Sequence, residues 1–121
     1  MDVQKIVEDF IACWNRGDVD AAWAMAADDI VWDNIPMGPA KGIEACKALM
    51  AQFPPIEGIE FVTHHIVAKG NIVMTERTDK FLVGGKWRAI RLMGIFEINT
   101  DGKVQHWRDY FDMAEFQREF A

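Results

Sequence analysis

The chain has 121 residues, half of them hydrophobic, and this length and composition predict a single domain over residues 1–121 with one core. The formal net charge of -6 argues against a nucleic-acid partner, since phosphate binding needs clustered Lys and Arg. No apolar run approaches the roughly 20 residues of a membrane span, and the polar N-terminus does not resemble a signal peptide, so we expect a cytoplasmic protein that does not engage a membrane.

The N-terminal half is expected to be mostly helical. Apolar residues at helical spacing predict an amphipathic helix over 2–15, which Gly17 ends. Asp18 is a good N-cap for a second helix over 19–27. A short strand over 29–35 follows and stops at the Pro-rich segment after it. A third helix is marked by Ile43, Cys46, Leu49, Met50 and Phe53.

The two cysteines, Cys13 and Cys46, both fall in predicted helices. Paired thiols are not typical of a cytosolic protein, so we expect two free thiols packed as small hydrophobic residues.

The C-terminal half changes character after Gly58 and becomes rich in Ile, Val, Thr and Phe. Turn signals divide it into long strands expected at 59–69, 71–83, 87–99 and 103–111, with a last helix at 112–120. Helices followed by an antiparallel meander describe an α+β domain. We expect a strongly curved, mostly antiparallel sheet with the N-terminal helices over its concave face and a pocket between the two layers.

Charged residues recur at a spacing of two on two of these strands. Side chains alternate faces along a strand, so Arg77 and Asp79 share one face, and Asp109 shares a face with Trp107 and Phe111. The opposite face of 71–83 is a polar stripe of Glu76, Thr78 and Lys80, which favours an inward Arg77 and Asp79. One interpretation is an exposed ion pair of little energetic value. The other is an arginine between two aspartates that share one proton, so that one acts as an acid and the other as a base.

Other candidate residues are fewer. Asn34 shares its strand face with Trp32, and its amide could orient a water or could simply be a turn residue before Pro36. The adjacent His64 and His65 are expected to point to opposite faces, so they could not serve one site. No metal-ligand spacing is present, and the chain has no Ser, which removes serine nucleophile chemistry.

These residues resemble the limonene epoxide hydrolase family. The similarity runs from Phe61 to Phe116, with a weaker match around Val31-Trp32-Asp33-Asn34-x-Pro36. The motifs that carry it are Thr75-Glu76-Arg77-x-Asp79, Leu92-Met93-Gly94-Ile95-Phe96, Gly102-Lys103 and Trp107-Arg108-Asp109-Tyr110-Phe111-Asp112. The resemblance implies a cone-shaped fold of the nuclear-transport-factor-2-like type, epoxide hydrolysis without cofactor or metal, and a homodimer.

Carried over residue by residue, the resemblance implies that Asp109 is the base that activates water and Asp79 the acid that protonates the epoxide oxygen. Arg77 bridges them, and Asn34 holds the water. Trp32 stands where the family commonly has a tyrosine that also holds this water, and an indole can donate a hydrogen bond but cannot accept one. The expected apolar wall, which favours a terpenoid, cyclic or aryl-aliphatic epoxide, consists of Phe81, Ile90, Leu92 and Phe111.

Three other functions stay open from the sequence. A ketosteroid-isomerase-like proton shuttle would need a tyrosine or protonated carboxyl aimed at an oxyanion, but Tyr110 faces away from Asp109 by strand parity. A cyclase would replace water with a substrate hydroxyl. A non-catalytic module that binds an apolar ligand would have no need for two carboxylates in its cavity.

Overall fold

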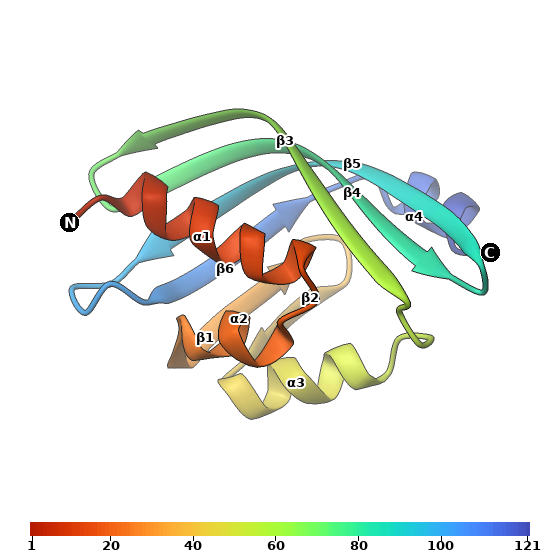
Figure 1. Cartoon of the computed structure of the whole chain (residues 1–121), viewed down its shortest axis with the longest axis horizontal. Coiled ribbons are helices and arrows are strands. Elements are labelled where there is room, and N and C mark those ends of the chain that lie inside the picture. Colours follow the sequence, from red (N-terminus) through yellow and green to blue (C-terminus); the bar gives the residue numbers. More distant parts are fainter.

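The computed structural model describes all residues 1–121 (Figure 1). Its elements, in chain order, are α1 (Val3–Asn15), α2 (Val19–Ala24), β1 (Ala26–Asn34), β2 (Gly38–Lys41), α3 (Ile43–Ala51), β3 (Gly58–Lys69), β4 (Ile72–Val83), β5 (Lys86–Ile98), β6 (Val104–Tyr110) and α4 (Met113–Glu119). None of the helices is long and apolar enough to cross a membrane.

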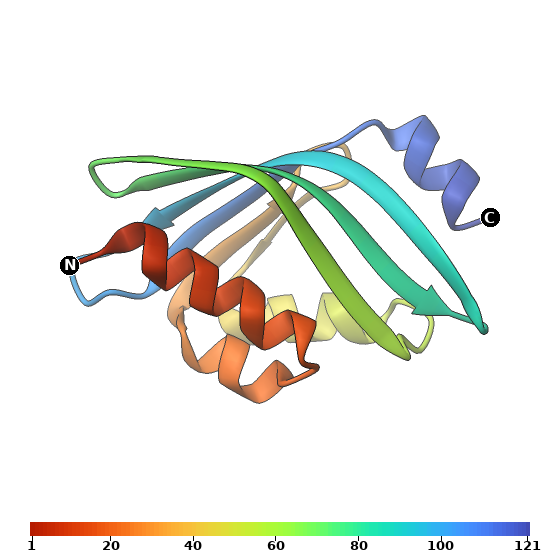
Figure 2. The same cartoon turned by 45° about the horizontal axis from the view of Figure 1, so that its top comes forward.

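The six strands form one open sheet in the order β2-β1-β6-β5-β4-β3. All neighbours are antiparallel except β1 and β6, which run parallel. The sheet arches strongly, and α1, α2 and α3 lie under its concave face while α4 stands at the far end (Figures 1 and 2). The predicted α+β fold, with its curved and mostly antiparallel sheet, is therefore confirmed.

The helix starts follow the sequence signals, but the second helix is shorter than predicted. The Asp2 carboxylate accepts a hydrogen bond from the Lys5 N–H at the start of α1, and Asp18 caps α2 in the same way. Instead of continuing to residue 27, α2 ends at Ala24, because Ala26 already pairs with Val104 of β6. Pairing across the sheet overrides the local helical pattern here.

A short strand, β2, was not predicted because its sequence contains Pro39. Its four residues pair with the end of β1, with Pro39 opposite Asp33. A proline lacks the N–H that a central strand needs, but β2 is the edge of the sheet, where one side needs no partner.

The prediction that His64 and His65 point to opposite faces is wrong. The β3–β4 register shifts between Thr63 and His65, which marks a β-bulge. A bulge adds one residue to a strand and so breaks the alternation of faces. His64 Nε2 lies 2.8 Å from the hydroxyl of Thr78, and His65 Nε2 lies 3.7 Å from Glu76, so both rings lie on the outer face of the sheet.

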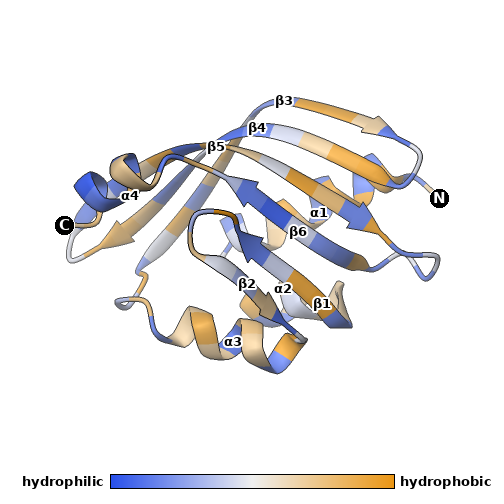
Figure 3. Ribbon diagram, turned by 180° about the vertical axis from the view of Figure 1, so that it is seen from behind, coloured by the Kyte–Doolittle hydropathy of each residue, from blue (hydrophilic) through white to orange (hydrophobic).

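The core lies between α1 and the concave face and is rich in aromatic rings. Trp107 is its centre, with ring centroids of Phe10 at 5.2 Å, Trp32 at 5.3 Å, Phe96 at 5.8 Å and Trp14 at 5.9 Å. Hydrophobic and hydrophilic residues follow each other along β4 and β5 (Figure 3), as expected for strands with one buried face. Cys13 and Cys46 are buried and unpaired, as predicted.

Candidate active site

The site is built along one row of residues that runs across the sheet. Thr75 of β4 pairs in register with Gly94 of β5, Gly94 pairs with Asp109 of β6, and Asp109 pairs with Asn34 of β1. Directly opposed residues of neighbouring strands point to the same face. Four strands, β4, β5, β6 and β1, therefore deliver these residues to one place on the concave face.

Arg77 joins the two aspartates. Its Nε and Nη2 donate to the two oxygens of Asp79 at 3.0 and 2.9 Å, and Nη2 also donates to Asp109 Oδ1 at 3.1 Å. The first contact is the bidentate geometry that suits a planar guanidinium. The predicted convergence of Arg77, Asp79 and Asp109 is thus present in the structure.

All three charged side chains are buried, with exposed fractions of 1% for Arg77, 3% for Asp79 and 4% for Asp109. Burial by itself would lower the pKa of Arg77, but the charges of Asp109 and Asp79 overcome that effect and hold it above its ordinary value. Burial raises the pKa of Asp109 to about 6, against the opposing attraction of Arg77. The arrangement is therefore not the exposed ion pair that the sequence left open.

The two oxygens of Asp109 have different surroundings. Oδ1 accepts from Arg77 and also from the indole N–H of Trp107 at 3.0 Å. Oδ2 accepts no hydrogen bond from the protein. Because Oδ1 is held by two donors, Oδ2 is the oxygen of Asp109 with free capacity to accept a hydrogen bond.

Asn34 lies opposite Asp109 in the sheet, and Trp32 lies opposite Trp107. Asn34 is 8% exposed, and its side-chain amide has no hydrogen-bond partner in the chain. Directly after it, the Ile35 N–H donates to the Asp109 carbonyl at 3.0 Å and ties this segment to β6. Trp32 stacks on Trp107 at 22° between the ring planes, and its indole N–H is buried without a partner. Both side chains therefore have unused hydrogen-bonding capacity.

Three of the four expected wall residues lie on the inner face. Ile90 is opposite Asp79, and Leu92 is opposite Arg77. Phe81 follows two residues after Asp79, and its ring packs against Phe61 with centroids 5.8 Å apart. This surface is apolar and continuous with the charged cluster.

Phe111 lies one residue beyond the end of β6. β6 ends at Tyr110 because Asp112 caps α4, where its side chain accepts from the Ala114 N–H. Strand parity therefore does not extend to Phe111, which packs against Phe116 of α4 with ring centroids 5.8 Å apart.

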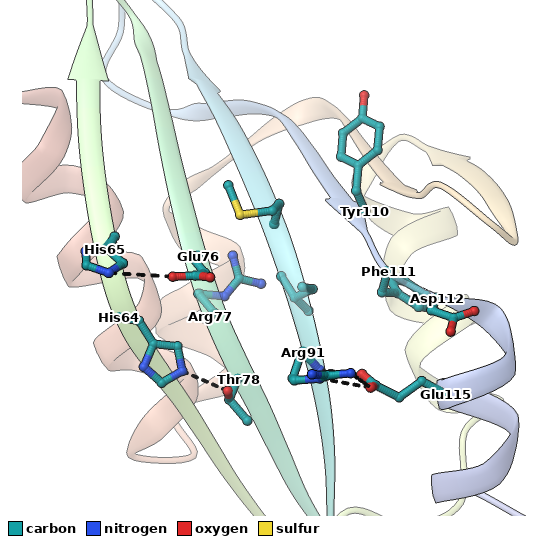
Figure 4. A pocket seen from close by; sticks show the side chains of 12 residues that line it. His64, His65, Glu76, Arg77, Thr78, Arg91, Tyr110, Phe111, Asp112 and Glu115 are labelled. Atoms are coloured by element: carbon teal, nitrogen blue, oxygen red, sulfur yellow. Dashed lines mark hydrogen bonds and ion pairs between the residues drawn. The ribbon is translucent and has the colours of Figure 1, made fainter.

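A groove of about 830 Å³ lies on the outer face of the sheet (Figure 4). The figure shows His64 beside Thr78, His65 beside Glu76, and Arg91 paired with Glu115 of α4. Arg77, Leu92 and Phe111 are among the residues that line this groove, whereas Asp79 and Asp109 are not. No group of three His, Cys, Asp or Glu side chains is placed to hold a metal ion.

Sequence reasoning missed Thr75 and Gly94 as parts of this site. Thr75 is 1% exposed, and its hydroxyl accepts from Arg77 Nη1 at 2.9 Å and donates to the Gly94 carbonyl at 3.0 Å. A signal existed: Gly94 interrupts the apolar face of its strand, and a lone glycine there marks a close approach of another group.

Comparison with known proteins gives consistent results. Residues 1–121 match the model of the limonene-1,2-epoxide hydrolase catalytic domain. Epoxide hydrolase EphG of Mycobacterium tuberculosis (strain ATCC 25618 / H37Rv) is 33% identical over 109 residues, which cover 90% of this chain and 72% of that protein. A solved M. tuberculosis LEH-like epoxide hydrolase superposes with a TM-score of 0.84 at 30% identity, over 98% of this chain and 88% of that one. An NTF2-like protein of unknown function from Burkholderia pseudomallei reaches a TM-score of 0.86 at 18% identity, covers 100% and 98% of the two chains, and shows the fold alone.

Proposed function

The chain belongs to the limonene-1,2-epoxide hydrolase family and is a cofactor-independent epoxide hydrolase, and we propose that Asp109, Arg77 and Asp79 carry out its reaction. The observation that carries the proposal is the buried carboxylate–guanidinium–carboxylate contact on an apolar face. With one proton shared by the two carboxyl groups, the cluster is formally neutral, which makes its burial tolerable.

In the proposed reaction, water attacks the epoxide directly. Asp109 Oδ2 takes a proton from the water as the water oxygen bonds to an epoxide carbon. The carbon–oxygen bond on that carbon breaks, and the epoxide oxygen takes the proton of Asp79. The product is a vicinal diol, and the cluster is reset when a proton returns from Asp109 to Asp79 through solvent exchange.

Two features support Asp109, rather than Asp79, as the base. Asn34 lies in register with Asp109, so the unused amide that could orient the water is on that side of Arg77. Asp79 has both oxygens held by Arg77 and lies opposite Ile90 of the apolar wall in the sheet register.

We propose an apolar substrate: a terpenoid, cyclic or aryl-aliphatic epoxide. The support is the inner surface of Phe81, Ile90 and Leu92 next to Asp79. The ring of Phe111 contacts Phe116, which stacks on Phe120, and Phe120 in turn contacts Phe81, so this chain of aromatic rings supports Phe111 as part of the same wall. Tyr110 is 49% exposed on the outer face, so the inner face has no tyrosine for ketosteroid-isomerase-like chemistry.

We also propose that the protein is a homodimer and that it is located in the cytoplasm. The outer sheet face supports the first because it exposes the apolar side chains of Val67, Met74, Met93 and Tyr110. Analytical ultracentrifugation tests it, and a monomer at micromolar concentration would contradict it.

The experiment that tests the proposed residues is diol formation from a panel of apolar epoxides, measured by chromatography. Asp79→Asn and Asp109→Asn should each lower turnover at least about a hundredfold, the scale of a general acid or base. Asp28→Asn, an exposed aspartate of β1, is the matched control and should keep wild-type turnover. Near-normal turnover in a folded Asp79→Asn or Asp109→Asn protein would refute the assignment.

Oxygen-18 water distinguishes direct attack from a covalent route. In a single turnover with excess enzyme, direct attack places the label in the diol. A nucleophilic aspartate would instead donate its own oxygen and leave the label in the protein. An unlabelled diol from the first turnover, with oxygen-18 in a peptide that contains Asp109 or Asp79, would therefore rule out the one-step mechanism.

A further inference from the structure

The Arg77 guanidinium lies over a bare position on the neighbouring strand. A Cβ atom added at Gly94 would be 2.2 Å from Arg77 Nη1 and 2.6 Å from Asp109 Oδ1, both far inside contact distance. The guanidinium therefore occupies the space that any side chain at position 94 would fill. This is how Arg77 of β4 reaches across β5 to Asp109 of β6.

Two aromatic rings limit the movement of the Arg77 guanidinium perpendicular to its plane. The Arg77 Cζ atom lies 5.4 Å from the ring centroid of Phe61 and 5.5 Å from that of Phe96. Such contacts favour a cation over the ring faces. They do not set how the planar group is rotated within its plane, and this rotation decides which nitrogen faces which carboxylate.

The Thr75 hydroxyl supplies the remaining contact. Its single proton is used on the Gly94 carbonyl, so it faces Arg77 Nη1 as an acceptor. With Nη1 held there, the edge formed by Nε and Nη2 faces Asp79, and Nη2 also reaches Asp109.

We propose that Thr75 is a positioning residue for epoxide hydrolysis, which sets the rotation of the Arg77 guanidinium and through it the link between the two aspartates. The inference rests on the proposed function of Asp79 and Asp109. If Thr75 were only a buried strand residue, its methyl group would matter and its hydroxyl would not.

The variants Thr75→Val and Thr75→Ser separate these two roles. Thr75→Val keeps the shape but removes the hydroxyl, so kcat should fall about ten- to a hundredfold, the scale of one lost hydrogen bond to a charged group. KM should stay within about twofold because Thr75 does not line the proposed apolar wall, and the acidic limb of the pH–rate profile should move to higher pH as Asp109 loses contact with Arg77. Thr75→Ser should keep the wild-type rate and profile.

A second readout does not depend on turnover. Carbon-13 NMR should show the Asp109 carboxyl titrating at higher pH in Thr75→Val than in the wild type and in Thr75→Ser. If the wild type makes no diol from any epoxide, the proposed function fails while this titration still judges the role of Thr75. An unchanged titration in Thr75→Val would overturn the inference, as would an unchanged kcat in a wild type that is active.

The wild-type protein provides a measurement if Thr75→Val does not fold. Nitrogen-15 NMR should resolve separate, slowly exchanging protons on Arg77 Nη1, because one of them is bonded to the buried Thr75 hydroxyl. A freely rotating Nη1 group would overturn the proposal.

Discussion

Alanine at position 94 should displace the group that links the two aspartates. The new Cβ atom would be 2.2 Å from Arg77 Nη1, and real Cβ contacts are not closer than about 3.0 Å, so one of the two must move by at least 0.8 Å (3.0 − 2.2). Gly94 is held between β4 and β6 by backbone pairing, so the guanidinium is the part that moves. It would move away from hydrogen bonds that are now 2.9 to 3.1 Å long.

The expected size of the effect follows from that displacement. A misplacement of about 1 Å in a catalytic group costs about a hundredfold in rate, so kcat/KM of Gly94→Ala should fall by about that factor. Overpacking a buried site costs about 1–3 kcal/mol. The lower flexibility of alanine in the unfolded chain offsets about 0.4–1 kcal/mol of this. The free energy of unfolding should therefore fall by about 1.3 kcal/mol when the middle of each range is taken, and by at most about 2.6 kcal/mol.

Gly58→Ala is the matched control, since Gly58 also lies in a strand without positive φ. Its added Cβ would meet the Cη2 atom of Trp87 at 3.1 Å, and that ring is half exposed and free to move. Diol formation and urea unfolding should be measured for both variants. Wild-type turnover and stability in Gly94→Ala would refute the argument that Arg77 needs this space.

Three further predictions concern the same cluster. Trp107→Phe should lower kcat about ten- to a hundredfold, because it removes the N–H that donates to Asp109. Trp14→Phe is the control and should leave kcat unchanged, because the Trp14 N–H has no partner. Equal losses of kcat in the two variants would show that only packing matters. Because the pKa of Asp109 is raised from 3.8 to about 6, the native state keeps a proton that the unfolded chain releases. Its contribution to stability is thus lost as pH rises from about 4 to 6, by up to roughly 3 kcal/mol, and this slope should be absent from urea unfolding of Asp109→Asn. A wild type and Asp109→Asn with parallel pH profiles of stability would contradict that raised pKa. Trp32→Tyr should show equal or higher diol formation, since a tyrosine can both donate to the water and accept from it; a large loss in a stable variant would make Trp32 a wall of the pocket instead.

Local periodicity was enough to predict much of this protein. The inward face of residues 71–83, with Arg77 and Asp79 on it, follows from the alternation of side chains along a single strand. The exposed position of Tyr110 and the N-caps at Asp2 and Asp18 depend in the same way on a few neighbouring residues. The motif pattern also predicted the family, which the match over the whole chain confirms.

Other features depend on how distant segments pair, and no short stretch of sequence contains them. The bulge that brings His64 and His65 to one face is a shift in register against β4, and the early end of α2 follows from the pairing of Ala26 with β6. The space over Gly94 has meaning only once β4, β5 and β6 lie side by side. The sequence by itself thus determined that Arg77 and Asp79 share one face of their strand, because alternation is a property of a single regular strand. Only the tertiary structure decided which hydrogen bonds Arg77 makes. Its partners are Asp79 and Thr75 on its own strand and Asp109 on β6, and the register of the whole sheet sets their distances.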